Sequence, residues 1–407
     1  MGSTRGIGVA DIERARAAIC DVIRATPVLS STTMSDRCGG SVALKAESLQ
    51  RTGSFKLRGA LNKLAELGAG CERGVVAGSA GNHAWALAEA AKARGVPCEV
   101  FMPRQAPLSK IEGCLALGAE VRLVGDTVDD CFAAAAERAR EGGMAFVHPF
   151  DDADVVAGQG TIGLELLEAV DDLAKIVVPL GGGGLSSGIA IAVKSARPDV
   201  EVVGVQARAC APYADSLMRG EPVAVASALT IADGIAVKRP GELTLGLVAR
   251  WLDDVVGVGE DEIAEAMVLL MEHSKLVVEG AGAVGAAALL GGLVAPAPRG
   301  TTVVVLSGGN VDAGMLAAVA RRHETQAGRR FVLFTRLPDR PGSLAHLLTC
   351  IAGAGANLLE VEHVREGVDL HVRETAVQLV LETRGAEHAR DVLAAIAGEG
   401  YVARVID

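Results

Sequence analysis

The 407-residue chain is poor in aromatic residues, which make up only 3% of it. Its interior must therefore be built from Ala, Val, Leu and Ile, and the many small residues predict helices packed closely on sheets. Long apolar runs are also missing, because Gly or charged residues interrupt every apolar stretch well short of the roughly 20 residues that span a membrane. We therefore predict no membrane association.

Basic runs are absent as well, and the formal net charge is −11. A nucleic-acid surface is thereby disfavoured, because neutralising phosphates requires a basic patch. The eight cysteines show no CxxC spacing and are expected to be reduced and mostly buried. Charged residues such as Asp11, Glu13 and Arg14 stand where an export signal would be apolar, so we expect a cytoplasmic protein.

What is present is typical of a soluble enzyme of two or three domains: half of the residues are apolar and 22% are charged. From Val75 to Leu306, short β-branched runs alternate with Ala-rich stretches, which predicts a parallel sheet covered by helices on both faces. The predicted strands are 75–78, 98–102, 120–124, 145–148, 176–180, 202–205 and 302–306. Helices are predicted over 84–94 and 108–118, each ending at a glycine.

The pattern changes after Gly309. A polar segment, 319–330, is interpreted as a helix end that runs into a linker. Strands are then predicted at 331–336, 357–363, 376–382 and 401–406, with helices at 343–352 and 387–396. This βαββαβ order in about 75 residues is typical of a small ferredoxin-like module. We therefore predict domains at 1–328 and 329–407.

Four clusters of residues at strand ends or helix starts suggest chemistry, because ligands bind at such junctions in open α/β sheets. The first is Ser54–Ala60, with Lys56 just after a Gly-Ser turn. Burial would favour the neutral amine, which is the nucleophile that a Schiff base requires. The alternative is an ordinary surface lysine at a helix start.

The second cluster comprises Ser79, Ala80, Gly81, Asn82 and His83, which follow a predicted strand and open a helix. Free N–H groups at a helix start favour a carboxylate or phosphate ligand. The alternative is a helix cap without a ligand.

The third cluster is Gly181, Gly182, Gly183, Gly184 and Leu185, directly after a predicted strand. Bare N–H groups in such a loop can approach a phosphate closely. A dinucleotide-binding loop is the competing interpretation, but Gln206 stands where a ribose-binding carboxylate is expected. The fourth cluster begins with Ser307, which offers one neutral hydroxyl at the end of a buried strand, or simply marks a turn.

Together the clusters resemble the fold-type II pyridoxal-phosphate enzymes, and within them the threonine dehydratases, over most of residues 5–315. The resemblance implies two open parallel-sheet α/β subdomains and pyridoxal 5'-phosphate as cofactor. The segments that carry it, besides the four clusters, are 45–56, 148–152, 157–161 and 232–238.

The resemblance also implies roles. Lys56 would bind the cofactor and later act as the base at Cα, Asn82 would hydrogen-bond the cofactor's phenolic oxygen, and the backbone of Ser79–His83 would hold the substrate carboxylate. Gly181–Leu185 would bind the phosphate. Ser307 would face the pyridine nitrogen, which a serine cannot protonate as a carboxylate can, so that elimination is favoured over transamination.

Three positions separate this chain from relatives. Serine racemases, which are similar, have a serine where Ala80 stands, and alanine has no proton to deliver, so a dehydratase is indicated. Trp85 replaces a smaller polar residue of threonine dehydratases, which bears on specificity. Gln206 replaces the carboxylate of metal-binding members, so we predict no Mg²⁺ or Mn²⁺ site, while a monovalent cation stays open.

The C-terminal module resembles an ACT domain through 337–344 and 356–363. In that family the first loop and the Asn-bearing strand border an amino-acid effector site, usually at a dimer interface. We expect isoleucine or valine as effector and a homotetramer or homodimer; a plain dimerisation module is the alternative. The candidate effector residues are Pro341, Gly342, Ser343, Leu344, Asn357 and Leu358.

The resulting hypothesis is dehydration and deamination of L-threonine to 2-oxobutanoate and ammonia. L-Serine or 3-hydroxyaspartate as substrate on the same scaffold is the nearest alternative. A different alternative is an amino-acid sensor with a relic catalytic domain, although a relic has no reason to keep Lys56, the glycine loop and Ser307 together. A role in isoleucine biosynthesis or in threonine breakdown is left open.

Overall fold

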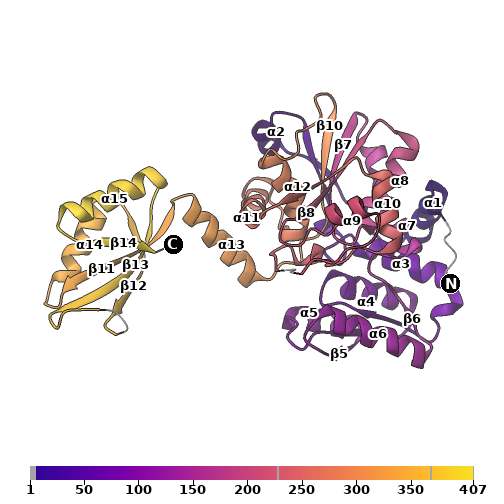
Figure 1. The fold of residues 1–407 in the computed structure, drawn as a ribbon, viewed down its shortest axis with the longest axis horizontal. Helices are drawn as coiled ribbons and strands as arrows, with labels where there is room; N and C mark the ends of the chain where they lie inside the picture. Colours follow the sequence, from indigo (N-terminus) through magenta and orange to yellow (C-terminus); the bar gives the residue numbers. More distant parts are fainter. Residues whose placement is uncertain (1–5, 227–228, 367–368, 407) are drawn as a thin grey trace. The chain divides into compact units, whose positions relative to one another are not determined.

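The structure is a computed structural model that describes residues 6–226, 229–366 and 369–406. The chain divides into two compact units, Met1–Asp312 and Ala313–Asp407, and the second is coloured orange to yellow in Figure 1. Among the described residues, no helix has the length and apolar character needed to cross a membrane.

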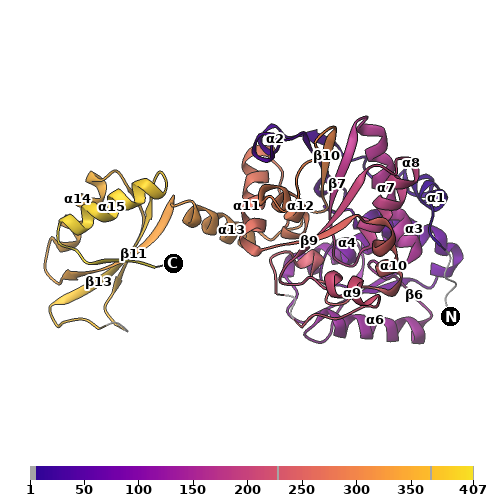
Figure 2. The ribbon, with the colours of Figure 1, turned by 45° about the horizontal axis from the view of Figure 1, so that its top comes forward.

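The first unit contains a six-stranded sheet in the order β1-β2-β10-β7-β8-β9, in which only β1 runs antiparallel to its neighbour. Helices cover both faces, as the parallel arrangement requires: α8 (Gly184–Ala196) packs on one face and α12 (Gly280–Leu290) on the other (Figures 1 and 2). The strands are β1 Val28–Ser30, β2 Val42–Ala46, β7 Leu173–Pro179, β8 Glu201–Ala207, β9 Asp254–Val258 and β10 Thr301–Leu306.

A second, smaller sheet in this unit is parallel throughout, in the order β5-β4-β3-β6. Its strands are β3 Val75–Gly78, β4 Cys98–Met102, β5 Glu120–Leu123 and β6 Ala145–Phe146. The helices associated with it are α3 Lys56–Leu67, α4 Asn82–Arg94, α5 Leu108–Ala116 and α6 Val128–Gly142. The Ala-rich α4 ends at Gly95, whose φ of 67° is the left-handed conformation that favours glycine.

The remaining α-helices of the first unit pack around the larger sheet or connect its strands. They are α1 Val9–Ile19, α2 Thr32–Cys38, α7 Ala153–Ala169, α9 Tyr213–Arg219, α10 Glu242–Trp251 and α11 Glu260–Leu269. The two open α/β subdomains that the family resemblance implied are therefore confirmed, with β1 as an antiparallel edge strand of the larger sheet.

The predicted strands differ from the observed ones in two ways. The run 145–148 ends as a strand at Phe146, because the ring Nδ1 of His148 accepts the N–H groups of Phe150 and Asp151 and turns the chain. The prediction also omitted β1, β2 and β9. In β2 the charged Lys45 interrupts the apolar pattern, yet it is buried and paired with Glu165.

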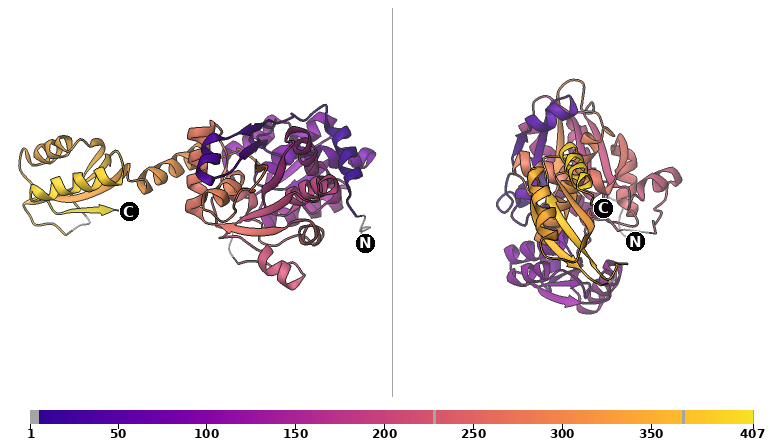
Figure 3. Two further views of the ribbon diagram at one scale, coloured as in Figure 1. Left: turned by 90° about the horizontal axis from the view of Figure 1, so that it is seen from above. Right: turned by 90° about the vertical axis from the view of Figure 1, so that its left-hand side faces the viewer.

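The second unit begins with α13 (Ala313–Gln326) and continues in a βαββαβ order, as predicted. Its strands form the antiparallel sheet β12-β13-β11-β14. The two helices that follow α13 in the chain, α14 and α15, lie on one face of this sheet (Figures 2 and 3). The elements are β11 Arg330–Pro338, α14 Ser343–Gly353, β12 Asn357–Val364, β13 Glu374–Glu382, α15 Ala386–Gly398 and β14 Ala403–Ile406.

The division between the units lies at Asp312, earlier than the boundary near residue 328 that the sequence suggested. The segment between these positions is α13, in which only Val319 is buried. Its polar surface made this helix resemble a linker.

Candidate active site

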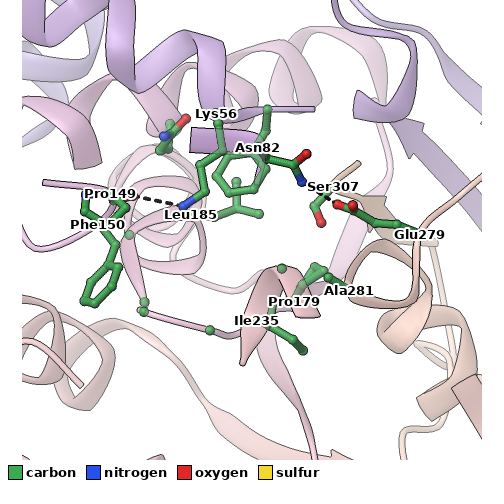
Figure 4. Close-up of a pocket in the computed structure, with 17 residues that line it drawn as sticks. Lys56, Asn82, Pro149, Phe150, Pro179, Leu185, Ile235, Glu279, Ala281 and Ser307 are labelled. Atoms are coloured by element: carbon green, nitrogen blue, oxygen red, sulfur yellow. Dashed lines mark hydrogen bonds between the residues drawn. The ribbon is translucent and has the colours of Figure 1, made fainter. Parts of the chain in front are cut away.

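One cavity, with about 480 Å³ of empty space, is lined by all of the predicted cofactor-binding residues. It lies where β7 and β10 of the larger sheet end, and α3 and α4 contribute residues from the smaller sheet's side (Figure 4). The predicted residues that line it are Lys56, Asn82, Gly181, Gly182, Gly183, Gly184, Leu185 and Ser307.

Lys56 is the first residue of α3 and is held next to Ser307 by the backbone. The N–H of Phe55 donates to the carbonyl oxygen of Ser307 at 3.0 Å, and Ser54 forms a β-bridge with Gly308. The Nζ of Lys56 donates to the carbonyl oxygen of Pro149 at 2.9 Å (Figure 4). The lysine and the Ser307 loop are therefore one local structure, although they lie far apart in the sequence.

Burial lowers the pKa of Lys56 to about 8, with the carboxyl of Glu279 opposing the shift. The neutral amine is therefore far more populated near neutral pH than in an ordinary lysine. This is the form that the sequence analysis required for a nucleophile.

The glycine loop leaves no room for side chains. A Cβ at Gly182 would lie 2.1 Å from the ring of Phe150, and one at Gly183 would lie 2.3 Å from the Oη of Tyr213. Gly183 also has a φ of +88° and is the N-cap of α8. Because the first N–H groups of a helix lack intrahelical acceptors, this loop offers donors and a positive helix end to an anion in the cavity.

The Ser79–His83 cluster enters the cavity only through Asn82, the first residue of α4. The N–H of Ser79 donates to Phe101 within the fold, and the ring of His83 contacts the carbonyl oxygen of Val147 at 2.9 Å. Burial lowers the pKa of His83 to about 3, so this ring stays neutral. Ser79, Ala80, Gly81 and His83 are not among the residues that line this cavity, and the role of their backbone in holding a carboxylate stays a prediction.

Glu279 is a cavity residue that the sequence analysis missed. Its side chain is 5% exposed, and burial together with Asp233 raises the pKa of Glu279 to about 7 against the opposing effects of Asn82, Lys110 and Lys56. One signal was available, since Glu279 is the only charged residue between Lys275 and Leu290. The other lining residues not predicted are Phe55, Pro149, Phe150, Gln159, Pro179, Gly234, Ile235 and Ala281.

Two positions singled out in the sequence lie outside the cavity. The indole of Trp85 donates to the carbonyl oxygen of Lys110 at 2.9 Å and occupies the space beside Gly113, so it packs α4 against α5. Gln206 is buried and its Oε1 accepts the N–H of Tyr213. Across the described ranges, no group of three or more His, Cys, Asp or Glu residues is placed to hold a metal ion.

The candidate effector residues are not brought together within one chain. Pro341, Gly342 and Ser343 line a wide groove with Arg336, Arg340, His346 and Tyr401. Leu344 packs against the core of the module instead. Asn357 pairs with Glu382 beside Arg330, at the opposite end of β11 from the loop, and Leu358 follows it.

Residues 19–308 match the family described as pyridoxal-phosphate dependent enzymes. An L-threonine ammonia-lyase of Thermotoga maritima is 43% identical over 401 residues, which cover 98% of this chain and all of that protein.

Among solved structures, the processed form of threonine deaminase isoform 2 from Solanum lycopersicum is 34% identical with a TM-score of 0.73, covering 77% of this chain and 86% of the other. Maize serine racemase is 34% identical with a TM-score of 0.74, covering 79% and 99%. The chain therefore belongs to the pyridoxal-phosphate-dependent enzymes, in the family that includes the L-threonine ammonia-lyases.

Proposed function

We propose that this chain converts L-threonine to 2-oxobutanoate and ammonia with pyridoxal 5'-phosphate as cofactor. The observation that carries the proposal is the meeting of the Lys56 amine, the Gly181–Gly184 loop and Ser307 in one cavity. The identity of 43% to an L-threonine ammonia-lyase along nearly the whole chain supports the choice of reaction.

The residues that line the cavity have the chemical groups needed to hold the cofactor. Lys56 would hold the aldehyde carbon through Nζ, and the N–H groups at the start of α8 would bind the phosphate, in a cradle that a Cβ at Gly182 would fill. Ser307 would face the ring nitrogen with a neutral hydroxyl. When bound, the cofactor supplies an electron sink for negative charge at the substrate Cα.

The residues of this chain then explain why elimination of water is favoured over other reactions at the substrate Cα. The neutral amine of Lys56, which burial favours, takes the proton from Cα. A neutral Ser307 keeps the sink weak, so prompt loss of the β-hydroxyl as water is favoured over a long-lived carbanion. The released enamine is hydrolysed to 2-oxobutanoate and ammonia.

Ala80 supports elimination over racemisation. Its methyl group has no proton to deliver to the second face of Cα, whereas a serine at this position has one. The proposal is tested by assaying 2-oxo acid formation from L-threonine, L-serine and 3-hydroxyaspartate; a higher kcat/KM for either of the last two would replace threonine as the substrate.

For the second unit we propose an ACT-type regulatory module that binds isoleucine or valine. The Pro341–Ser343 loop borders a groove that also holds Arg336 and Arg340, which suit a carboxylate. Asn357 lies at the far end of the sheet, so a second copy of the chain would have to supply it to complete such a site. A homodimer or homotetramer follows from this proposal.

A further inference from the structure

The side chain of Asn82 is held at both ends of its amide group. Nδ2 of Asn310 donates to the carbonyl oxygen of Thr52 and to Oδ1 of Asn82, at 2.8 Å in each case. Nδ2 of Asn82 donates to Oε1 of Glu279 at 2.6 Å (Figure 4). Thr52, Asn310, Asn82 and Glu279 thus form one chain of hydrogen bonds that reaches the cavity at Asn82 and Glu279.

The chemistry of these groups permits one orientation of each amide. A backbone carbonyl oxygen only accepts, so the Asn310 atom that faces Thr52 must be its nitrogen. That nitrogen also faces Asn82, which must therefore present its oxygen. The nitrogen of Asn82 is left to face Glu279, whose carboxyl accepts from it.

Glu279 is itself confined by the backbone around it. The backbone N–H of Glu279 donates to the carbonyl oxygen of Gly308 at 3.1 Å, and a Cβ at Gly308 would lie 2.3 Å from Oε1 of Glu279. The segment before Glu279 contains a π-helical turn, Leu270–Ser274, and then Lys275, whose φ of 59° is uncommon for a residue with a side chain. Such irregular turns are frequent at functional sites.

The chain of bonds also crosses between the two sheets of the first unit. Asn82 begins α4 beside the smaller sheet, whereas Asn310 follows β10 of the larger sheet and Glu279 precedes α12, which packs on that sheet. The orientation of Asn82 is therefore set by residues on the other side of the cavity.

We propose that Glu279 and Asn310 are positioning residues that hold the amide of Asn82 so that its second N–H donates into the cavity, to an oxygen of the bound cofactor. An amide nitrogen carries two N–H groups in one plane, so fixing the oxygen and one N–H fixes the direction of the other. This inference rests on the proposed function for the identity of the cofactor.

The test compares Glu279→Ala, Glu279→Gln, Asn310→Ala and Asn82→Ala by the visible absorption of the bound cofactor and by titration of the cofactor-free protein with pyridoxal 5'-phosphate. Loss of one oriented hydrogen bond is expected to weaken cofactor binding about tenfold in the three alanine variants. All three should show the same shift in the absorption maximum. Glu279→Gln keeps an oxygen acceptor for Asn82 and should stay within about twofold of the parent protein.

The double variant Glu279→Ala/Asn82→Ala separates positioning from a general loss of stability. Its cofactor affinity should equal that of Asn82→Ala alone, because Glu279 acts through Asn82. Glu272→Ala, which removes an exposed carboxylate from the same segment, should leave the spectrum and affinity unchanged.

Additive losses in the double variant, or a Glu279→Gln spectrum like that of Glu279→Ala, would overturn the inference. Neither readout involves threonine. If the parent protein binds the cofactor but does not dehydrate threonine, the proposed function fails while this comparison still decides the roles of Glu279 and Asn310.

Discussion

Arg58 and Glu47 form an ion pair with no solvent exposure, in which Nη2 of Arg58 lies 2.8 Å from Oε1 of Glu47. A second carboxylate, Glu165, lies 2.6 Å from Nη1 of Arg58. Burial would raise the pKa of Glu47, but the guanidinium of Arg58 outweighs it and holds that pKa below its usual value. The two ion pairs fasten α3, two residues after Lys56, to the segment directly after β2 and to α7.

Arg58→Ala is expected to lower the free energy of unfolding of the cofactor-free protein by about 3–5 kcal/mol, because it strands buried carboxylates without a partner. Urea titration measures the change. Arg14→Ala removes an exposed arginine that pairs with Asp11 and should cost less than about 1 kcal/mol. Equal effects of the two substitutions would contradict this account of the buried pair.

The rate at which the cofactor-free protein takes up pyridoxal 5'-phosphate should rise with pH and level off above about pH 8. The neutral amine of Lys56 is the reacting form, and burial lowers its pKa from the ordinary 10.5 to about 8. Between pH 8 and 10.5 the folded chain binds fewer protons at Lys56 than the unfolded chain. The free energy of unfolding therefore rises with pH through that window, as the cost of burying the charged amine falls.

Stopped-flow absorption measures the uptake rate at each pH. Glu279→Gln removes the carboxyl that opposes the shift, so its half-maximal rate should occur at lower pH. Lys56→Ala should show neither the absorption of the attached cofactor nor turnover. A rate in the parent protein that keeps rising to about pH 10, near the ordinary pKa of a lysine, or near-normal dehydration by Lys56→Ala, would refute the assignment of Lys56.

Racemisation should be negligible beside elimination, because Ala80 has no proton to give to the second face of Cα. Chiral chromatography of the amino acid that remains after partial turnover of L-serine or L-threonine measures this. Ala80→Ser restores a hydroxyl at this position and should produce detectable D-serine. Substantial D-serine from the parent protein would show that another group supplies the proton.

Isoleucine, and valine more weakly, should bind the full-length protein and change its activity through the second unit. Calorimetry measures binding, and the proposed site predicts loss of binding in both Arg340→Ala and Asn357→Ala, although the two positions lie at opposite ends of one module. A chain that ends at Asp312 is the control. Binding to that chain as strong as to the parent, or no binding to the parent, would rule out the module as the sensor.

Much of the site was predictable because its elements are local. A turn at Gly53, a strand that leads into Gly181–Gly184 and a strand that ends at Ser307 are each written in a few consecutive residues, and α/β topology brings such junctions to one edge of a sheet. The role of the Ser79–His83 loop stays a prediction. Of its residues only Asn82 lines the cavity, and the N–H of Ser79 donates to Phe101 on the neighbouring strand, a contact that no local pattern reveals.

The sequence by itself determined the alternation of strands and helices, the βαββαβ module and the junctions that carry Lys56, the glycine loop and Ser307, because strand and helix periods and backbone demands act over short stretches. Only the tertiary structure decided the hydrogen-bond partners and the burial of those groups. Glu279 meets Asn82 across 197 positions and Arg58 meets Glu165 across 107. Burial by distant segments lowers the pKa of Lys56. The tertiary structure also gives Glu279, the lone charged residue of an apolar run, a hydrogen-bond partner in Asn82.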